Sequence, residues 1–124
     1  MNMSAKRVYE PPGPDDGKRV LVDRVWPRGL TKEAAAVDLW MKEIAPSTWL
    51  RRWFHRDPMR WQEFMRRYRS ELDSNGAAVD RLRDLCASGR VTLVYADRDT
   101  RHNHALVLAD YMAELEKASR RQEA

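Results

Sequence analysis

Residues 96–104, ADRDTRHNH, combine cationic, anionic and titratable side chains in one short segment. The guanidinium groups of Arg98 and Arg101 suit the paired hydrogen bonds that hold a phosphate, sulfate or carboxylate group. Imidazole titrates near neutral pH, so His102 and His104 are the catalytic candidates for moving a proton. The carboxylate of Asp97 would orient the arginines. The segment therefore predicts an anion site, with catalysis left open.

A second charged segment, DRVWPRG, begins at Asp23 and supplies Arg24 and Arg28. The two segments lie at the carboxyl ends of strands expected at 18–26 and 90–96. In open α/β sheets, ligands bind outside the carboxyl ends of the strands. We therefore expect the arginines of both segments to converge on the first turn of the last helix, whose free amides attract anions. Asp23 would orient them together with the aspartate of the first segment.

Two other interpretations use the same side chains. Asp23, Asp97 and Asp99 are available to pair with the arginines, and such pairs often only pin loops. Alternatively, His102 and His104 with one of these aspartates would offer metal ligands. Residues two apart at the start of a helix do not face the same point, so we predict no metal site.

The elements that must position these side chains alternate along the chain. A further strand is expected at 6–10, and helices at 31–36, 46–54, 57–73, 77–87 and from about Asn103 onward, with Thr31, Ser47 or Thr48, and Asp57 as N-caps. Strands separated by helices predict one α/β domain of three layers, with a mainly parallel sheet flanked by helices. By periodicity, segment 37–46 fits either a helix or a strand.

Composition limits the classes of protein that remain. The 124 residues are expected to form a single domain, 1–124, with an ordered core at about 6–115 and a polar C-terminal tail. The single cysteine, Cys86, excludes an intrachain disulfide framework and a multi-cysteine zinc site, and its apolar helical face predicts a buried small hydrophobe. No apolar leader and no apolar run of ~20 residues is visible, so a cytoplasmic protein without a membrane span is expected.

The helices within residues 47–73 mix aromatic residues with many arginines. Such a mixture can bind single-stranded nucleic acid. Helical spacing explains the aromatics more simply, because they form apolar stripes typical of a core: Trp53, Phe54, Trp61, Phe64 and Tyr68. The net charge of +4, from 23 basic and 19 acidic side chains, is too mixed to identify a nucleic-acid-binding protein.

Three segments together resemble a known family: VDRVWPRG, APSTWLRRWFHRDPMRWQEFMRRYRSEL and VTLVYADRDTRHNHALVLADYM. They are similar to domain-of-unknown-function family 488 (DUF488), in its YeaO-like branch, over residues 6–115. The resemblance implies a fold and a place to look for a site rather than an activity. It also implies a helix followed by a strand in the ambiguous region, so we expect 37–43 to be a strand.

The resemblance also shows where this chain departs from other branches of that family. Those branches end the last strand with a cysteine and carry a Cys-His-Arg triplet at the following helix. Here Tyr95 stands at the first position, and Asn103, His104 and Ala105 stand at the triplet. Cysteine-based redox or metal chemistry therefore does not carry over, and only the histidine of the triplet remains.

Together these observations predict an uncharacterised cytoplasmic protein that binds an anion at the strand carboxyl ends, with a small-molecule enzyme left open and no cofactor identified. Two alternatives remain. One is a nucleic-acid-binding module that uses helices 47–73. The other is a structural or interaction protein without catalysis, with a tryptophan-rich homodimer surface.

Overall fold

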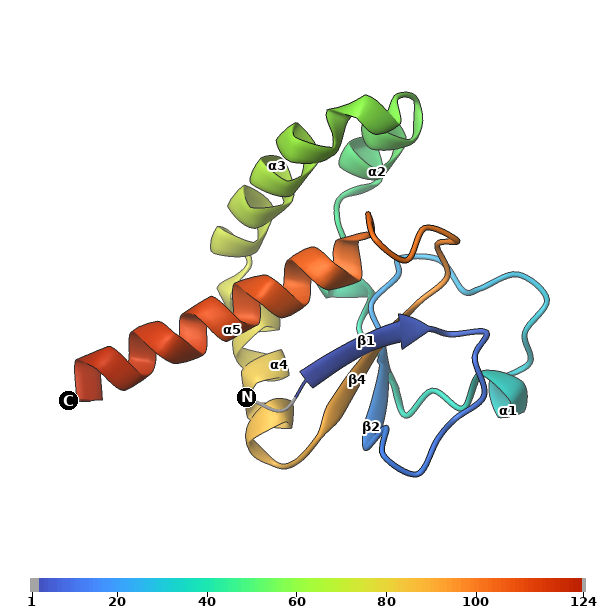
Figure 1. Cartoon of the computed structure of the whole chain (residues 1–124), viewed down its shortest axis with the longest axis horizontal. Coiled ribbons are helices and arrows are strands. Elements are labelled where there is room, and N and C mark those ends of the chain that lie inside the picture. Colours follow the sequence, from blue (N-terminus) through green and yellow to red (C-terminus); the bar gives the residue numbers. More distant parts are fainter. Residues whose placement is uncertain (1–2, 124) are drawn as a thin grey trace.

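Four parallel strands form the central sheet in the computed structural model, which describes residues 3–123 (Figure 1). The strands are β1 (Met3–Arg7), β2 (Lys18–Leu21), β3 (Leu39–Trp40) and β4 (Val91–Tyr95), and their order in the sheet is β1-β4-β2-β3. All three neighbouring pairs are parallel. The predicted α/β domain with a parallel sheet is confirmed.

The central strands are buried on both faces, as parallel strands usually are. Val20, Leu21 and Val22 are all 0% exposed, and every residue of β4 is buried. Burial on both faces requires a cover on each side of the sheet. It therefore explains why the apolar residues of these strands run consecutively instead of alternating with polar ones.

Helices cover the two faces unequally. Helices α2 (Thr48–His55), α3 (Trp61–Asp73), α4 (Gly76–Ala87) and α5 (His104–Glu123) belong to the larger core, with Val20 and Leu93 of the sheet. The other face, with Leu21 and Val94, is covered by the short helix α1 (Lys32–Ala35) and by apolar side chains of the segment around it. In Figure 1, α2 and the start of α3 project away from the sheet.

Local capping explains where several helices begin. The side-chain oxygens of Thr31 and Ser47 accept hydrogen bonds from backbone amides of the first turns of α1 and α2, each at 3.1 Å. Asp57 caps a short 3-10 helix at Pro58–Arg60, and α3 follows it directly. The side-chain oxygen of Asn103 accepts from the amide of Leu106 at 3.1 Å and starts α5.

Several predicted boundaries are wrong because strand pairing determines them. β1 lies at 3–7 rather than 6–10, since it pairs with β4 from Met3 opposite Val91 to Arg7 opposite Tyr95. β2 ends at Leu21 rather than at residue 26. The predicted strand at 37–43 is only the two-residue β3, because β2 offers it two partners, and a 3-10 helix at Lys42–Ile44 follows. Separately, residues 116–123, which were expected to form a polar tail, are the last turns of helix α5.

Candidate functional site

A cavity of about 450 Å³ opens at the carboxyl ends of the strands. Segments that follow each strand contribute to its lining: Tyr9 after β1, residues 23–28 after β2, Ala45 and Pro46 after β3, and residues 96–98 after β4. The first residue of α5 and parts of α2 and α3 complete it. This is the position at which open α/β sheets usually bind ligands.

Six of the eight residues proposed from the sequence line this cavity: Asp23, Arg24, Arg28, Asp97, Arg98 and His104. The other two, Arg101 and His102, do not line it. The structure thus brings together side chains from two segments about seventy positions apart in the chain. Their roles in binding or catalysis remain predictions.

The arginines of the cavity have no carboxylate partners within the described residues. Arg24 donates from Nε to the carbonyl oxygen of Pro46 and from Nη2 to that of Ala45, both at 3.2 Å. The guanidinium groups of Arg28 and Arg98 form no hydrogen bond or ion pair in the part of the chain that is described. The alternative in which these arginines pair with Asp23 or Asp97 therefore does not describe this structure.

Asp23 and His104 connect the end of β2 to the start of α5. Asp23 accepts a hydrogen bond at Oδ2 from the amide of Ala96 at 3.0 Å, and its Oδ1 lies 3.0 Å from Nε2 of His104. The same Nε2 lies 3.0 Å from the carbonyl oxygen of Val22. Because a carbonyl only accepts, Nε2 must carry a hydrogen, which leaves Nδ1 to exchange a proton. Both side chains are 15% exposed.

Two polar atoms at the cavity are buried without a well-formed hydrogen bond. One is Oδ1 of Asp23, and the other is Nε of Arg51 on α2. Both residues line the cavity. Buried polar atoms are nearly always hydrogen-bonded in folded proteins.

Arg51 and His55 are cavity residues that the sequence analysis missed. The available signal was spacing, because Arg51, Phe54 and His55 lie at i, i+3 and i+4 on α2 and so share one face. All three line the cavity.

Arg101 and His102 lie outside the cavity because Asp99 organises the turn before α5. Its Oδ1 accepts hydrogen bonds from the amides of Arg101 and His102, each at 2.9 Å. These bonds hold the pKa of the Asp99 carboxyl below its usual value. The ring of His102 also lies 3.2 Å from Asp99 and meets Trp61 edge-on, with centroids 5.2 Å apart. Both residues are exposed.

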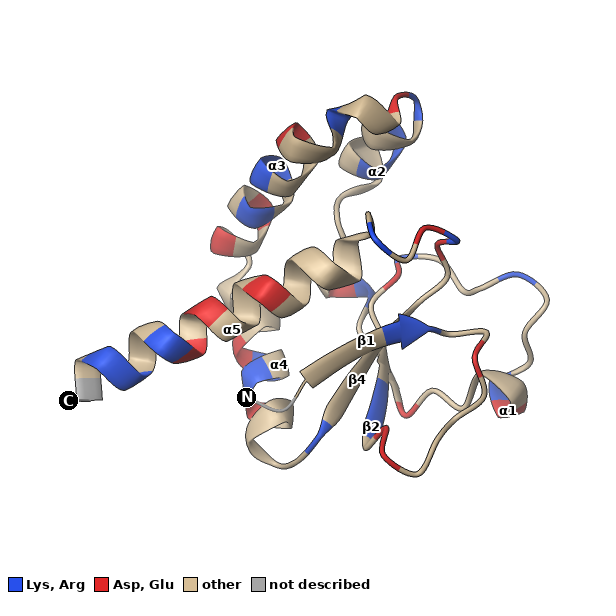
Figure 2. Cartoon of the chain, viewed as in Figure 1, with Lys and Arg blue, Asp and Glu red and all other residues tan. Residues whose placement is uncertain are grey.

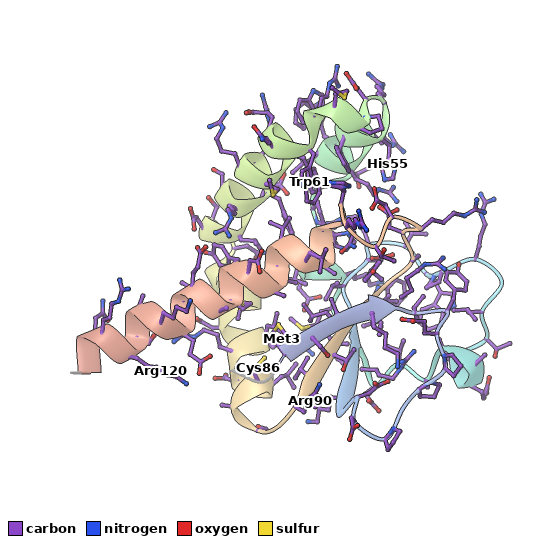
Figure 3. The ribbon with its side chains drawn as sticks, in the orientation of Figure 1. Met3, His55, Trp61, Cys86, Arg90 and Arg120 are labelled. Atoms are coloured by element: carbon purple, nitrogen blue, oxygen red, sulfur yellow. The ribbon has the colours of Figure 1, made fainter. Side chains whose placement is uncertain are left out.

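Other kinds of site find no support in the described residues. No group of three or more histidine, cysteine, aspartate or glutamate side chains gathers there in a way that could hold a metal ion. Burial raises the pKa of the Cys86 thiol to about 11, and Figure 3 places this residue far from His55 at the cavity. Within residues 3–123, every helix is too short or too polar to cross a bilayer.

Comparison with known proteins gives consistent matches over most of the chain. A family model described as "Inactive DUF488-N3 subclade" matches residues 2–124. "Uncharacterized protein YeaO" of Escherichia coli (strain K12) is 45% identical over 115 residues, which cover 93% of this chain and all of that protein. "Uncharacterized protein Rv3073c" of Mycobacterium tuberculosis (strain ATCC 25618 / H37Rv) is 48% identical over 106 residues, 86% of this chain and 89% of that protein. No solved structure gave a significant match.

Proposed function

The chain belongs to the DUF488 family, in its YeaO-like branch, and on that premise we propose that it binds a small anion in the cavity at the strand carboxyl ends. The ligand class is a phosphate, sulfate or carboxylate. A volume of about 450 Å³ suits a small molecule. The apolar side chains of the lining would contact an organic part of the ligand, and the arginines would hold its charge.

The observation that carries this proposal is the uncompensated charge of the lining. The lining includes two aspartates and four arginines, which are Arg24, Arg28, Arg51 and Arg98. Placing like charges together is costly unless an anion offsets them. The buried Nε of Arg51 still lacks a partner within the described residues. An anion in the cavity would offset the positive charge of these arginines.

We propose binding without covalent catalysis. The cavity lining includes no cysteine, serine or threonine, so a nucleophile of these types is absent from that part of the structure. The matched family model carries the word "Inactive" in its description, in agreement with this reading. A proton-transfer reaction would have to use Nδ1 of His104 or the ring of His55.

The test is a titration of the purified protein with phosphate, sulfate and benzoate at low ionic strength. Binding should raise the melting temperature, because a ligand that prefers the folded state stabilises it. Calorimetry then measures the affinity of Arg98→Gln. A hydrogen bond to a charged group is worth about 1.5–3 kcal/mol, so this variant should bind about 10- to 150-fold more weakly.

Arg52→Gln is the matched control. Arg52 is exposed on α2 and does not line the cavity, so its loss should leave the affinity unchanged. The proposal fails if none of the three anions shifts the melting temperature. It also fails if the two arginine variants weaken binding equally, since that result indicates nonspecific attraction to a basic protein.

A further inference from the structure

Trp49 is an aromatic residue that the core does not explain. It is 59% exposed, whereas the other tryptophans of the chain are at least half-buried. The apolar stripes that account for Phe64 and Tyr68 leave it facing solvent at the start of α2. One exposed apolar residue is ordinary in a soluble protein. The arrangement around Trp49 is what distinguishes it.

Trp49 belongs to a stacked pair that arginines hold in place. Its ring lies nearly parallel to that of Trp53, with centroids 6.0 Å apart and 15° between the planes. The guanidinium carbon of Arg67 lies 5.6 Å from the Trp49 centroid and 4.9 Å from that of Trp53. Arg60 lies 4.8 Å from the Trp53 centroid and donates to the Trp53 carbonyl oxygen. This stacked pair of Trp49 and Trp53, the tryptophan platform, is therefore ordered before any partner binds.

An open groove of about 630 Å³ runs beside this platform, between residues 43–50 and α3. Trp49, Arg66 and Arg67 are among its lining residues. The two arginines share the single carboxylate of Glu63, which leaves one positive charge beside the tryptophans. The groove is also lined by two carboxylates: Glu43 pairs with Arg81, and Glu71 accepts a hydrogen bond from the amide of Ser47. Figure 2 shows arginine-bearing segments recurring along α2 and α3, with acidic segments among them on α3.

We infer that the surface formed by Trp49, Trp53, Arg66, Arg67 and the adjoining groove binds single-stranded nucleic acid. A base would extend the indole stack from the exposed part of Trp49, and the arginines would contact the neighbouring phosphates. Duplex DNA keeps its bases stacked internally, so it cannot use the platform. A second copy of the chain would bring further positive charge to an arginine-rich surface, which favours the anionic partner.

The test measures fluorescence anisotropy of labelled dT12 and rU12 with the full chain at 50 and 200 mM NaCl, with a 12-base-pair duplex for comparison. Three phosphate contacts give a salt exponent of about −2 for single strands, which weakens binding about 20-fold across this range. Each stacked base contributes about 5- to 150-fold in affinity, so Trp49→Ala should bind weaker by a factor in that range. Trp49→Phe should restore most of the loss.

Met59→Ala is the matched control, because Met59 is 91% exposed and lies in the short 3-10 helix between α2 and α3. It should bind like the original chain. Arg98→Gln should also bind like the original chain, since Arg98 lines the anion cavity and not the groove. Arg24 lines both the cavity and the groove, so its substitution would not distinguish the two sites. Melting curves confirm that each variant folds.

Three results would overturn the inference. The first is no binding of either oligonucleotide at about 100 µM protein and 50 mM salt, where even nonspecific nucleic-acid binding is measurable. The second is equal binding by Trp49→Ala and the original chain. The third is a loss of oligonucleotide binding in Arg98→Gln as large as that in Trp49→Ala, which would place the phosphates in the cavity. If Trp49→Ala instead changes only the sedimentation from dimer to monomer, the surface serves self-association.

Discussion

Replacing Asp16 by asparagine should lower the free energy of unfolding at pH 7 and should remove part of its dependence on acid. Asp16 is the carboxylate partner of Arg19, whose Nη1 lies 2.9 Å from Oδ2. Arg19 is only 2% exposed, and its Nη2 donates to the carbonyl of Ala35 at 2.9 Å. Lys6 and the amide of Gly13 also donate to Asp16. The cluster ties the loop after β1 to the sheet and to α1.

The magnitude follows from the pKa of Asp16. The amide of Gly13, with the side chains of Arg19 and Lys6, lowers this pKa from 3.8 to about 2. Each pKa unit corresponds to about 1.4 kcal/mol, which gives an upper value of about 2.5 kcal/mol. The side chain is 12% exposed, and solvent screening reduces the figure to about 1–2 kcal/mol. We expect the melting temperature to fall by roughly 4–8 °C.

The sign of the acid dependence is defined by the same shift. The folded pKa lies below the unfolded one, so the stabilisation is fully present above pH ~4 and is lost as the pH falls toward ~2. Urea unfolding followed by circular dichroism at pH 7, 4, 3 and 2 measures this loss. The difference between the original chain and Asp16→Asn should shrink across that window.

Asp15→Asn is the control for this prediction, because Asp15 is the exposed neighbour in the same loop. It should change the unfolding free energy by less than about 0.5 kcal/mol. The reasoning is refuted if both variants unfold alike at pH 7. Parallel stability curves for Asp16→Asn and the original chain between pH 4 and 2 would refute it as well.

Two further predictions concern the same scaffold. Gly17→Ala should destabilise the fold by more than about 2 kcal/mol in urea unfolding, because Gly17 has φ +63° and an added Cβ would lie 2.2 Å from the Arg90 carbonyl oxygen. Gly76 has open space around it, so the control Gly76→Ala should be neutral or stabilising. Equal effects of the two substitutions would contradict the argument. Cys86 should react with a thiol reagent at pH 8 far more slowly in the folded chain than in urea, because burial raises its pKa to about 11; similar rates would contradict this.

The cavity positions of Arg24, Arg28 and Arg98 could be predicted from local sequence because they depend on topology alone. Residues that directly follow the strands of a parallel sheet lie at the same edge, so Arg24 and Arg98 line one cavity. The predicted and observed strand boundaries differ by several residues, but this difference does not change the edge at which the arginines lie. The Asn103 start of α5 was also visible, since its side chain caps the helix.

Other parts of the site depend on tertiary orientation, which local patterns do not record. Arg51 reaches the cavity only because α2 is oriented with that face inward. Arg101 and His102 are excluded because Asp99 binds the amides of both residues and turns the loop outward. Trp49 and Trp53 lie four positions apart on α2, so helical spacing predicts their contact, but the exposure of Trp49 depends on how α2 packs against the rest of the chain.

The segment at 22–38 both shields one face of the sheet and carries Asp23, Arg24 and Arg28. Its side chains, with the short α1, cover Leu21 and Val94 on that face. In the proposed function, one stretch of backbone would therefore both contact the anion and shield the sheet from water. Local opening of residues 22–38 would release a bound anion and expose β2 and β4 to water at the same time. An anion in the cavity should therefore slow amide hydrogen exchange along these two strands.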